Sequence, residues 1–123
     1  MGKKLNERVG ALEYDELIIG NHPVADVVFV DLAAGSGVIK RGTVIIGEPG
    51  KTFAPIAVAA SAGKALYIVA EDVDITGSDP VTATVYRSGR FNRQRRLTDG
   101  TYAITKADEE YLRLGNILLE DAV

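Results

Sequence analysis

The stretch RSGRFNRQRR, residues 87–96, holds the residues best suited to chemistry with anions. Five of its ten residues are arginine and none is acidic. A guanidinium group is planar, stays charged at neutral pH and forms paired hydrogen bonds with phosphate or carboxylate. The stretch is therefore a candidate for nucleic-acid contact, for a small-anion site or for a protein interface, through Arg87, Arg90, Arg93, Arg95 and Arg96.

The charge of the remaining chain argues against nucleic acid. The 123 residues carry 14 Lys and Arg against 17 Asp and Glu, so only nine bases lie outside this stretch. Proteins held by phosphate contacts need a broad basic face, because affinity rises with the number of phosphates neutralised. Single-strand binders also place aromatic residues among the basic ones, and the stretch has only Phe91. A small β-barrel nucleic-acid-binding module that uses 87–96 as a loop is the alternative hypothesis.

Two other segments match known site patterns only in part. GEPGKT, residues 47–52, follows a predicted strand as a phosphate-binding loop does, but Ile45 stands where the pattern requires its first glycine. DVDITG, residues 72–77, matches the first half of a calcium loop, but Ala83 stands where a bidentate Glu should close it. Both segments are better explained as turns.

Acid–base and nucleophilic chemistry have little support in this chain. Glu71, Asp72 and Asp74 could move protons, but carboxylates clustered on a turn are usually solvated. The chain has one histidine, His22, and no cysteine, so neither thiol chemistry nor a thiolate metal site is possible. We expect a protein that is not an enzyme, with no catalytic residue, metal or cofactor.

Short strands separated by turns dominate the chain from Pro23 onward. The clearest is residues 81–87, in which apolar and polar side chains alternate with a period of two. Residues 24–32 form a nearly continuous apolar run, which predicts a strand buried on both faces. Further strands are predicted at 42–48, 52–58, 65–73 and 117–119. The sequence predicts a mostly β, small α+β fold, a compact barrel-like domain over 23–123.

One helix is predicted near the C-terminus. Thr105 is a suitable N-cap, and Asp108 three residues later completes a capping-box pattern. Ala107, Tyr111 and Leu114 recur at helical spacing and are the expected buried stripe. Gly115 follows at the position where helices commonly end.

Residues 1–22 have no clean periodicity and form a predicted extended arm. They mix charged residues with five large apolar ones, which predicts docking onto a partner: Leu12, Tyr14, Leu17, Ile18 and Ile19. An edge strand packed on its own domain explains the same pattern equally well. No apolar run approaches the ~20 residues that span a bilayer, so we expect no membrane partner.

The order of several segments resembles the lambda-type head decoration proteins of tailed bacteriophages. The resemblance lies in ALYIVAEDVD, TATVYRSGRFNR and ITKADEEYLRLGNILLEDAV, and covers about residues 40–123. Tyr86, Arg87, Ser88, Gly89 and Phe91 carry its most specific part. The chain differs from the lambda pattern because its arm is not proline-rich and it has no tryptophan.

The resemblance implies a structural function. Members of that family are small β-rich proteins that form trimers at the local three-fold axes of an expanded capsid and brace it against packaged DNA. The implied partners are the major capsid protein and further copies of this chain. The implied location is the outer capsid surface of the virion, after synthesis in the cytoplasm of a bacterial host. Residues 1–22 would be the capsid-binding arm.

Within this picture the arginine stretch is expected to serve a subunit interface. Gly89 is expected to permit a sharp turn after the strand, and Phe91 to anchor the following loop on the core. The arginines would then face a neighbouring subunit or the shell. Asp108, Glu109 and Glu110 at the start of the helix would supply the matching carboxylates.

Overall fold

The longest element of the fold is a strand, β8 (Val81–Asn92), around which the rest of the domain is organised. The computed structural model describes residues 16–98, 100 and 102–121. The fold is mostly β with one helix, as predicted. The other elements are β1 (Ile18–Gly20), β2 (Asp26–Leu32), β3 (Val38–Ile39), β4 (Val44–Gly47), β5 (Phe53–Pro55), β6 (Ala65–Val69), β7 (Val73–Asp74), α2 (Lys106–Leu114) and β9 (Ile117–Glu120).

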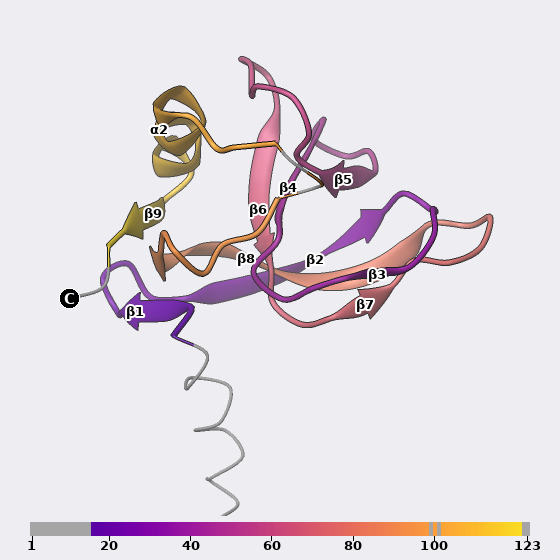
Figure 1. Ribbon diagram of the computed structural model, residues 1–123, viewed down its shortest axis with the longest axis horizontal. Coiled ribbons are helices and arrows are strands. Elements are labelled where there is room, and N and C mark those ends of the chain that lie inside the picture. Colours follow the sequence, from indigo (N-terminus) through magenta and orange to yellow (C-terminus); the bar gives the residue numbers. More distant parts are fainter. Residues whose placement is uncertain (1–15, 99, 101, 122–123) are drawn as a thin grey trace, which may run out of the picture.

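The first half of β8 closes a five-stranded barrel. Its neighbours are β2 on one side and β6 on the other, and β5 and β4 complete the ring between them (Figure 1). The β2–β8 ladder is antiparallel and continuous from Val27↔Tyr86 to Leu32↔Val81. In contrast, β2 and β5 run parallel and meet at a single pair, Leu32↔Phe53. The barrel is therefore closed between β2 and β5 at Leu32, the last residue of β2, and the two strands are not paired toward the start of β2.

The second half of β8 leaves the barrel and pairs with two short strands. β1 lies antiparallel to it, with Ile18 opposite Phe91. β9 lies parallel to it on the other side, from Gly89↔Ile117 to Asn92↔Glu120. The predicted strand at 81–87 thus continues to residue 92, and the predicted basic loop begins only after it.

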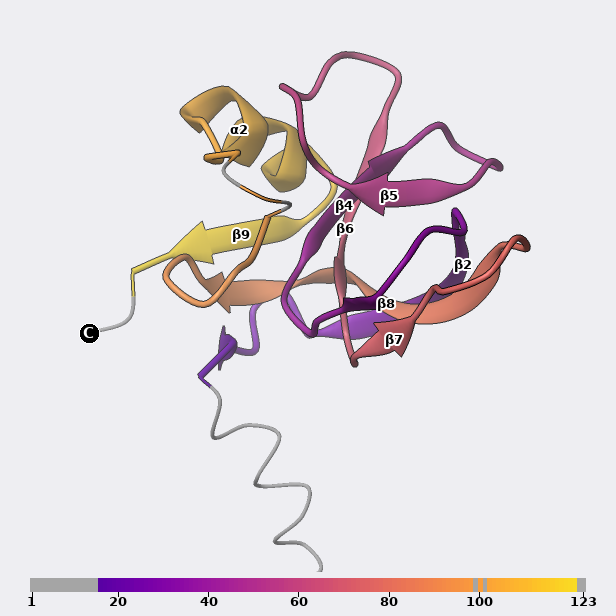
Figure 2. The same cartoon turned by 45° about the vertical axis from the view of Figure 1, so that its right-hand side comes forward.

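Alternation along the strands produces two hydrophobic cores. In β6, Val69 points into the barrel, where it joins Leu32, Phe53 and other buried side chains. Ile68, its neighbour, points to the opposite side and joins Phe91 in a second core between the barrel wall, α2, β1 and β9. Figure 2 shows α2 and β9 together on one side of the barrel. The second core fixes where the end of β8 and its arginines lie.

The helix begins as predicted but turns a different face inward. The Thr105 side chain accepts from the Asp108 N–H, and the Asp108 carboxylate accepts from the Thr105 N–H, so the capping box is present. The predicted stripe is right only for Tyr111, which is half-buried against the second core. Ala107 is exposed and Leu114 is 81% exposed, whereas Leu112 and Asp108 are buried. The apolar spacing pointed to the wrong face because a buried, hydrogen-bonded carboxylate occupies the inward position.

The prediction that residues 24–32 are buried on both faces is also wrong. β2 alternates between half-buried and exposed positions until Leu32. Phe29 is 73% exposed and Val27 is 44% exposed on the outer surface of the barrel. The sequence alone does not distinguish the exposed face of β2 from a buried one, because the same apolar residue types occur on both.

Candidate functional site

Three of the five arginines form ion pairs with single carboxylates of the same chain. Arg87 Nη2 lies 2.6 Å from Asp26 Oδ2, Arg90 Nε lies 3.7 Å from Glu120, and Arg95 Nη2 lies 3.1 Å from Glu16. The hydrogen bond from Arg87 holds the pKa of Asp26 below its usual value. These pairs connect β8 and the segment after it to β2, to β9 and to Glu16, two residues before β1.

Arg93 has the most complete set of partners. Its Nε and Nη2 donate to the two oxygens of Glu109 at 2.8 and 3.0 Å, and its Nη1 donates to Asp121 at 2.9 Å. Nη2 also donates to the backbone carbonyl of Leu119 at 2.8 Å. The hydrogen bonds with Glu109 and Asp121 raise the pKa of Arg93. Arg93 therefore holds the end of β8 against α2 and β9.

The carboxylates at the start of α2 are already paired within the chain. Glu109 binds Arg93, and Glu110 binds Arg113 three residues later on the helix. Asp108 is fully buried and cannot reach a neighbouring subunit. The expectation that these acids pair with arginines of another copy is therefore wrong for Asp108. For Glu109 and Glu110 it would require each carboxylate to leave its arginine within the chain, Arg93 or Arg113, for one of another copy.

Arg96 differs from the other four arginines. Among the described residues it has no ion pair. Its buried Nε has no hydrogen-bond acceptor, a feature that it shares with the Nε of Arg90. Burial lowers its pKa, with Glu109 acting in the opposite direction. It lines a groove of about 580 Å³ together with Arg93, Lys106, Glu109, Glu110 and Arg113. Within the Arg-rich stretch, Arg96 is the guanidinium group best placed to bind an external carboxylate.

Gly89 does not form the predicted turn. It lies within β8, pairs with Ile117 of β9, and has φ of +147°, a conformation that L-residues rarely adopt. A Cβ at this position would lie 2.7 Å from Cζ of Phe91 and 3.3 Å from Cα of Ala25. The glycine is needed so that the buried Phe91 ring can pack directly against the strand. The anchoring role predicted for Phe91 fits its complete burial.

Gly89→Ala is expected to lower the free energy of unfolding by about 3 kcal/mol, from backbone strain plus overpacking. Gly77→Ala is the matched control. Gly77 has a similar φ of +136° but nothing within 4 Å of the added Cβ, so only the strain of about 1 kcal/mol applies. Urea unfolding of both variants measures the difference. Equal losses at the two positions would show that contact with Phe91 is not what requires a glycine at 89.

Three residues assigned to the arm belong to the folded domain. Leu17 is 1% exposed and packs in the second core, and its carbonyl accepts from the Asn92 N–H at 2.7 Å. Ile18 and Ile19 lie in β1, beside β8. The arm boundary at residue 22 is therefore wrong, since ordered packing begins by Leu17. Leu12 and Tyr14 lie outside the described residues, and their role in docking stays a prediction.

The splayed side of the barrel presents an apolar surface. Only Leu32 of β2 pairs with β5, and within the described part of the chain no strand covers that edge from Asp26 to Val30. Val27 and Phe29 project from this segment. This part of β2 offers both unpaired backbone groups and exposed apolar side chains, a combination that soluble proteins usually avoid.

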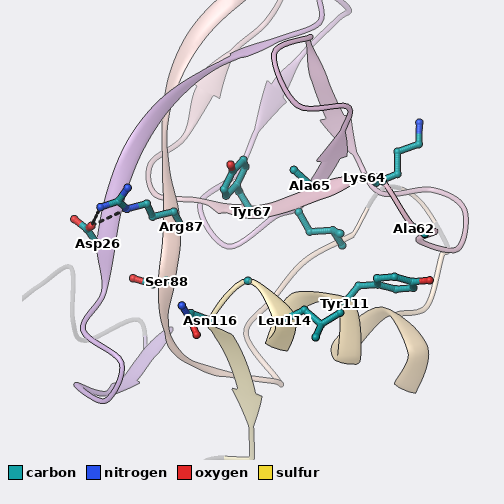
Figure 3. Close-up of a pocket in the computed structure, with 13 residues that line it drawn as sticks. Asp26, Ala62, Lys64, Ala65, Tyr67, Arg87, Ser88, Tyr111, Leu114 and Asn116 are labelled. Atoms are coloured by element: carbon teal, nitrogen blue, oxygen red, sulfur yellow. Dashed lines mark hydrogen bonds and ion pairs between the residues drawn. The ribbon is translucent and has the colours of Figure 1, made fainter.

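A cleft of about 780 Å³ opens beside the start of β2 (Figure 3). Tyr67, Tyr111 and Leu114 contribute to its lining, and the Asp26–Arg87 ion pair lies at one side. Sequence reasoning missed both this cleft and the exposed part of β2. No local pattern marks them, because each depends on how distant segments meet. The exposed part of β2 results from its single pairing with β5, and the cleft lies between the start of β6, β8 and the end of α2.

The remaining carboxylate cluster serves local structure. Asp72 accepts from the Arg41 N–H at 2.7 Å, and Asp74 accepts from the Thr76 N–H at 2.9 Å. The Thr76 hydrogen bonds lower the pKa of Asp74. Over the described ranges, no group of three or more His, Cys, Asp or Glu could hold a metal ion. The same residues include no helix long and apolar enough to cross a membrane.

Comparisons with protein-family models, with curated proteins and with solved structures found no match to this chain.

Proposed function

We propose that this protein is a virion structural protein. It acts as a trimeric decoration protein that binds the outer surface of an expanded phage capsid at local three-fold axes and stabilises it against packaged DNA. The observation that carries the proposal is the exposed part of β2, where Phe29 and Val27 project beside an unpaired strand edge. Such a surface suits contact with another protein far better than chemistry on a small molecule.

The order of motifs over residues 40–123 supports the choice of a capsid as the partner. The predicted arm also supports a capsid as the partner. The arm is shorter than predicted, but its residues 1–15 still include Leu12 and Tyr14. An extended segment of this kind can add a strand to an exposed sheet edge of the shell. Three arms on one trimer would bind together, so that weak single contacts combine through a high effective concentration.

The alternative, nucleic-acid binding through residues 87–96, has less support from the geometry. Four of the five arginines have carboxylate partners at 2.6 to 3.7 Å. Phosphate would have to compete with those carboxylates. Phe91, the aromatic residue of the stretch, is fully buried and cannot stack on a base.

The proposal is tested by mixing the purified protein with expanded, undecorated phage shells. Electron microscopy should show density at local three-fold positions, and shells should then resist heating better. Phe29→Ser is expected to weaken shell binding at least about tenfold, as loss of a central apolar anchor does, while the melting temperature stays nearly unchanged. Val58→Ser is the control, because Val58 is also exposed, at 69%, but lies on a loop outside β2.

Two results would count against the proposal. One is an absence of bound protein on shells from several phages at micromolar concentration. The other is tight DNA binding at physiological salt with the steep salt dependence of several phosphate contacts, which would favour the alternative.

A further inference from the structure

The edge of β2 that faces away from β8 has backbone groups without a strand partner. Thr84 lies opposite Phe29 in the β2–β8 ladder, yet its carbonyl accepts from the Ala70 N–H at 3.0 Å, on the β6 side of β8. Thr84 therefore directs its backbone groups away from β2, and Phe29↔Thr84 is a pair without ladder hydrogen bonds. The N–H and C=O of Phe29 consequently point to the other edge of β2, where no described strand pairs before Leu32.

Two further hydrogen bonds agree with this orientation. The Ala33 N–H, four residues after Phe29, donates to the Phe53 carbonyl of β5 at 2.9 Å. Alternate residues of a strand direct their backbone groups to the same side, so Val27 and Phe29 use the side that Ala33 uses. The Val27 N–H donates to the side chain of its neighbour Asp26 at 3.0 Å. Phe29 thus presents a donor and an acceptor at the centre of this edge.

A groove runs beside this edge. A hollow of about 350 Å³ has Phe29 on one side and Lys51 and Phe53 on the other. It meets the cleft of about 780 Å³ at Tyr67, which lines both, and we name the two hollows together the edge groove (Figure 3). The groove borders β2 from residue 26 to residue 31, a length of roughly 17–20 Å at about 3.3 Å per residue. Five or six extended residues would fill it.

The walls of the edge groove define the chemistry of its occupant. A polypeptide in extended conformation supplies the acceptor and the donor that match Phe29, while its side chains alternate between two faces. Side chains on one face would meet Val30 and Tyr67, which are half-buried against the barrel core. Side chains on the other face would lie beside the exposed Val27 and Phe29. The fitting segment is therefore apolar on both faces.

The charges in the edge groove add one requirement. Arg87 and Lys64 line the groove, and each has a carboxylate partner within the chain. Asp31 accepts from the Thr82 hydroxyl at 3.0 Å. Lys51 is exposed beside Phe29 and has no ion pair with any residue that the structure describes. An acidic residue of the occupant would be favoured next to Lys51, since complementary charges fix the register of a contact.

We propose that the edge groove receives an extended segment of the shell subunit, which adds to β2 as a strand and fills the opening between β2 and β5. The segment is apolar on both faces over about five residues and carries an acidic residue beside Lys51. The inference rests on the proposed function for the source of the segment, and it adds the binding mode and the sequence character of what is bound. It makes β2 the receiving edge, whereas the predicted arm is a donated strand.

The groove also restricts which segments can enter. Both of its walls belong to this chain, so the occupant must be a single strand without a sheet attached to its far edge. That condition excludes β2 of a second copy, which is paired with its own β8 along its whole length. A terminal or looped segment of the shell subunit satisfies the condition.

Substitution of Phe29 by proline and by serine tests the strand pairing in the full-length protein. Both variants lose the ring, but only Phe29→Pro also loses the N–H that points into the groove. Proline is tolerated at edge positions whose N–H faces solvent. Cosedimentation with expanded, undecorated shells measures the affinity. Phe29→Pro should bind at least about tenfold more weakly than Phe29→Ser, because its ring removes the donor and blocks the approach of a strand.

Lys51→Glu tests the charge requirement in the same assay. It is expected to weaken shell binding at least about threefold at low salt and less at high salt, because like charges then face each other across the contact. Lys106→Glu is the matched control, since it makes the same charge change at an exposed lysine that does not line the groove. It should bind as the wild type does.

Hydrogen–deuterium exchange of the wild-type protein keeps the test independent of how the variants fold. The Phe29 amide should exchange rapidly in the free protein and slowly on shells. The Val28 amide faces β8, because strand residues alternate, and should be protected in both states. Electron microscopy of the same shells should show density along β2 that is continuous with the shell subunit.

The outcomes separate this inference from the proposed function. Equal shell binding by Phe29→Pro and Phe29→Ser, with a Phe29 amide still unprotected on shells, would overturn strand addition and leave capsid decoration standing. Protection of that amide in the free protein would also overturn the shell segment as occupant. Dependence on concentration would then identify a second copy, and loss of protection on deletion of residues 1–15 would identify the arm. Failure of the wild type to bind any shell would overturn both proposals.

Discussion

Deletion of residues 1–20 is expected to lower the free energy of unfolding by at least about 5 kcal/mol, which is enough to unfold many domains of this size. The deletion removes Leu17, a fully buried leucine whose truncation alone costs about 2–5 kcal/mol. It also removes β1 and the hydrogen bond from the Asn92 N–H to the Leu17 carbonyl. The exposed edge of β8 would then leave Phe91 without its cover. Circular dichroism during urea unfolding measures the loss.

Deletion of residues 1–15 is the matched control. It keeps Glu16, Leu17 and β1, so the melting temperature should stay within a few degrees of the full-length value. The same variant should lose shell binding if Leu12 and Tyr14 anchor the arm. Equal melting temperatures for the two truncations would show that Leu17 contributes little, and they would restore the arm boundary at residue 22.

Asp108→Ala is expected to lower the free energy of unfolding by about 4 kcal/mol, because it removes a buried charged acceptor from three partly buried donors at once. The Asp108 side chain accepts from the Ala60 N–H at 2.8 Å and from the Thr105 N–H at 3.0 Å, and it also accepts from the Tyr102 hydroxyl. It thereby connects α2, the preceding segment and the loop before β6. Glu110→Ala is the control, since its exposed pair with Arg113 should contribute less than about 1 kcal/mol.

The same carboxyl group gives the stability a defined dependence on pH. Burial alone would raise the pKa of Asp108, but hydrogen bonds from Tyr102, Ala60 and Thr105 hold it below 3.8, and the bond with Asp108 raises the pKa of Tyr102 to about 12. A depressed pKa means that the stabilisation is complete above the unfolded value and is lost as the pH falls through the folded one. Asp108→Asn should therefore flatten the acid limb of the stability curve. An unchanged slope below pH 4 would contradict this role.

The parts of the fold that could be predicted from the sequence are those set by local chemistry. The alternation in residues 81–87 identified β8, because a half-buried strand requires a period of two. The capping box of Thr105 and Asp108 identified the start of α2, because both hydrogen bonds form within four residues. A mostly β barrel followed from the number of short strands separated by turns.

The parts that could not be predicted depend on contacts between distant segments. β1 has only three residues, and its packing depends on the second half of β8, about seventy residues later. The carboxylates that pair with the arginines come from β2, β9, α2 and Glu16, two residues before β1, so spacing along the chain does not indicate them. The turn predicted at Gly89 is wrong, because its geometry follows from where the Phe91 ring lies.

The antiparallel pairing of β1 with the end of β8 has a mechanical consequence. Ile18 lies opposite Phe91, and the Leu17 carbonyl accepts from the Asn92 N–H. Tension applied at residue 16 along the strand direction would load the hydrogen bonds of β1 in shear, so that they resist together and not one after another. Tension applied across the strand would peel β1 away bond by bond. A domain tethered through residue 16 should therefore resist force along β8 strongly and force perpendicular to β8 weakly.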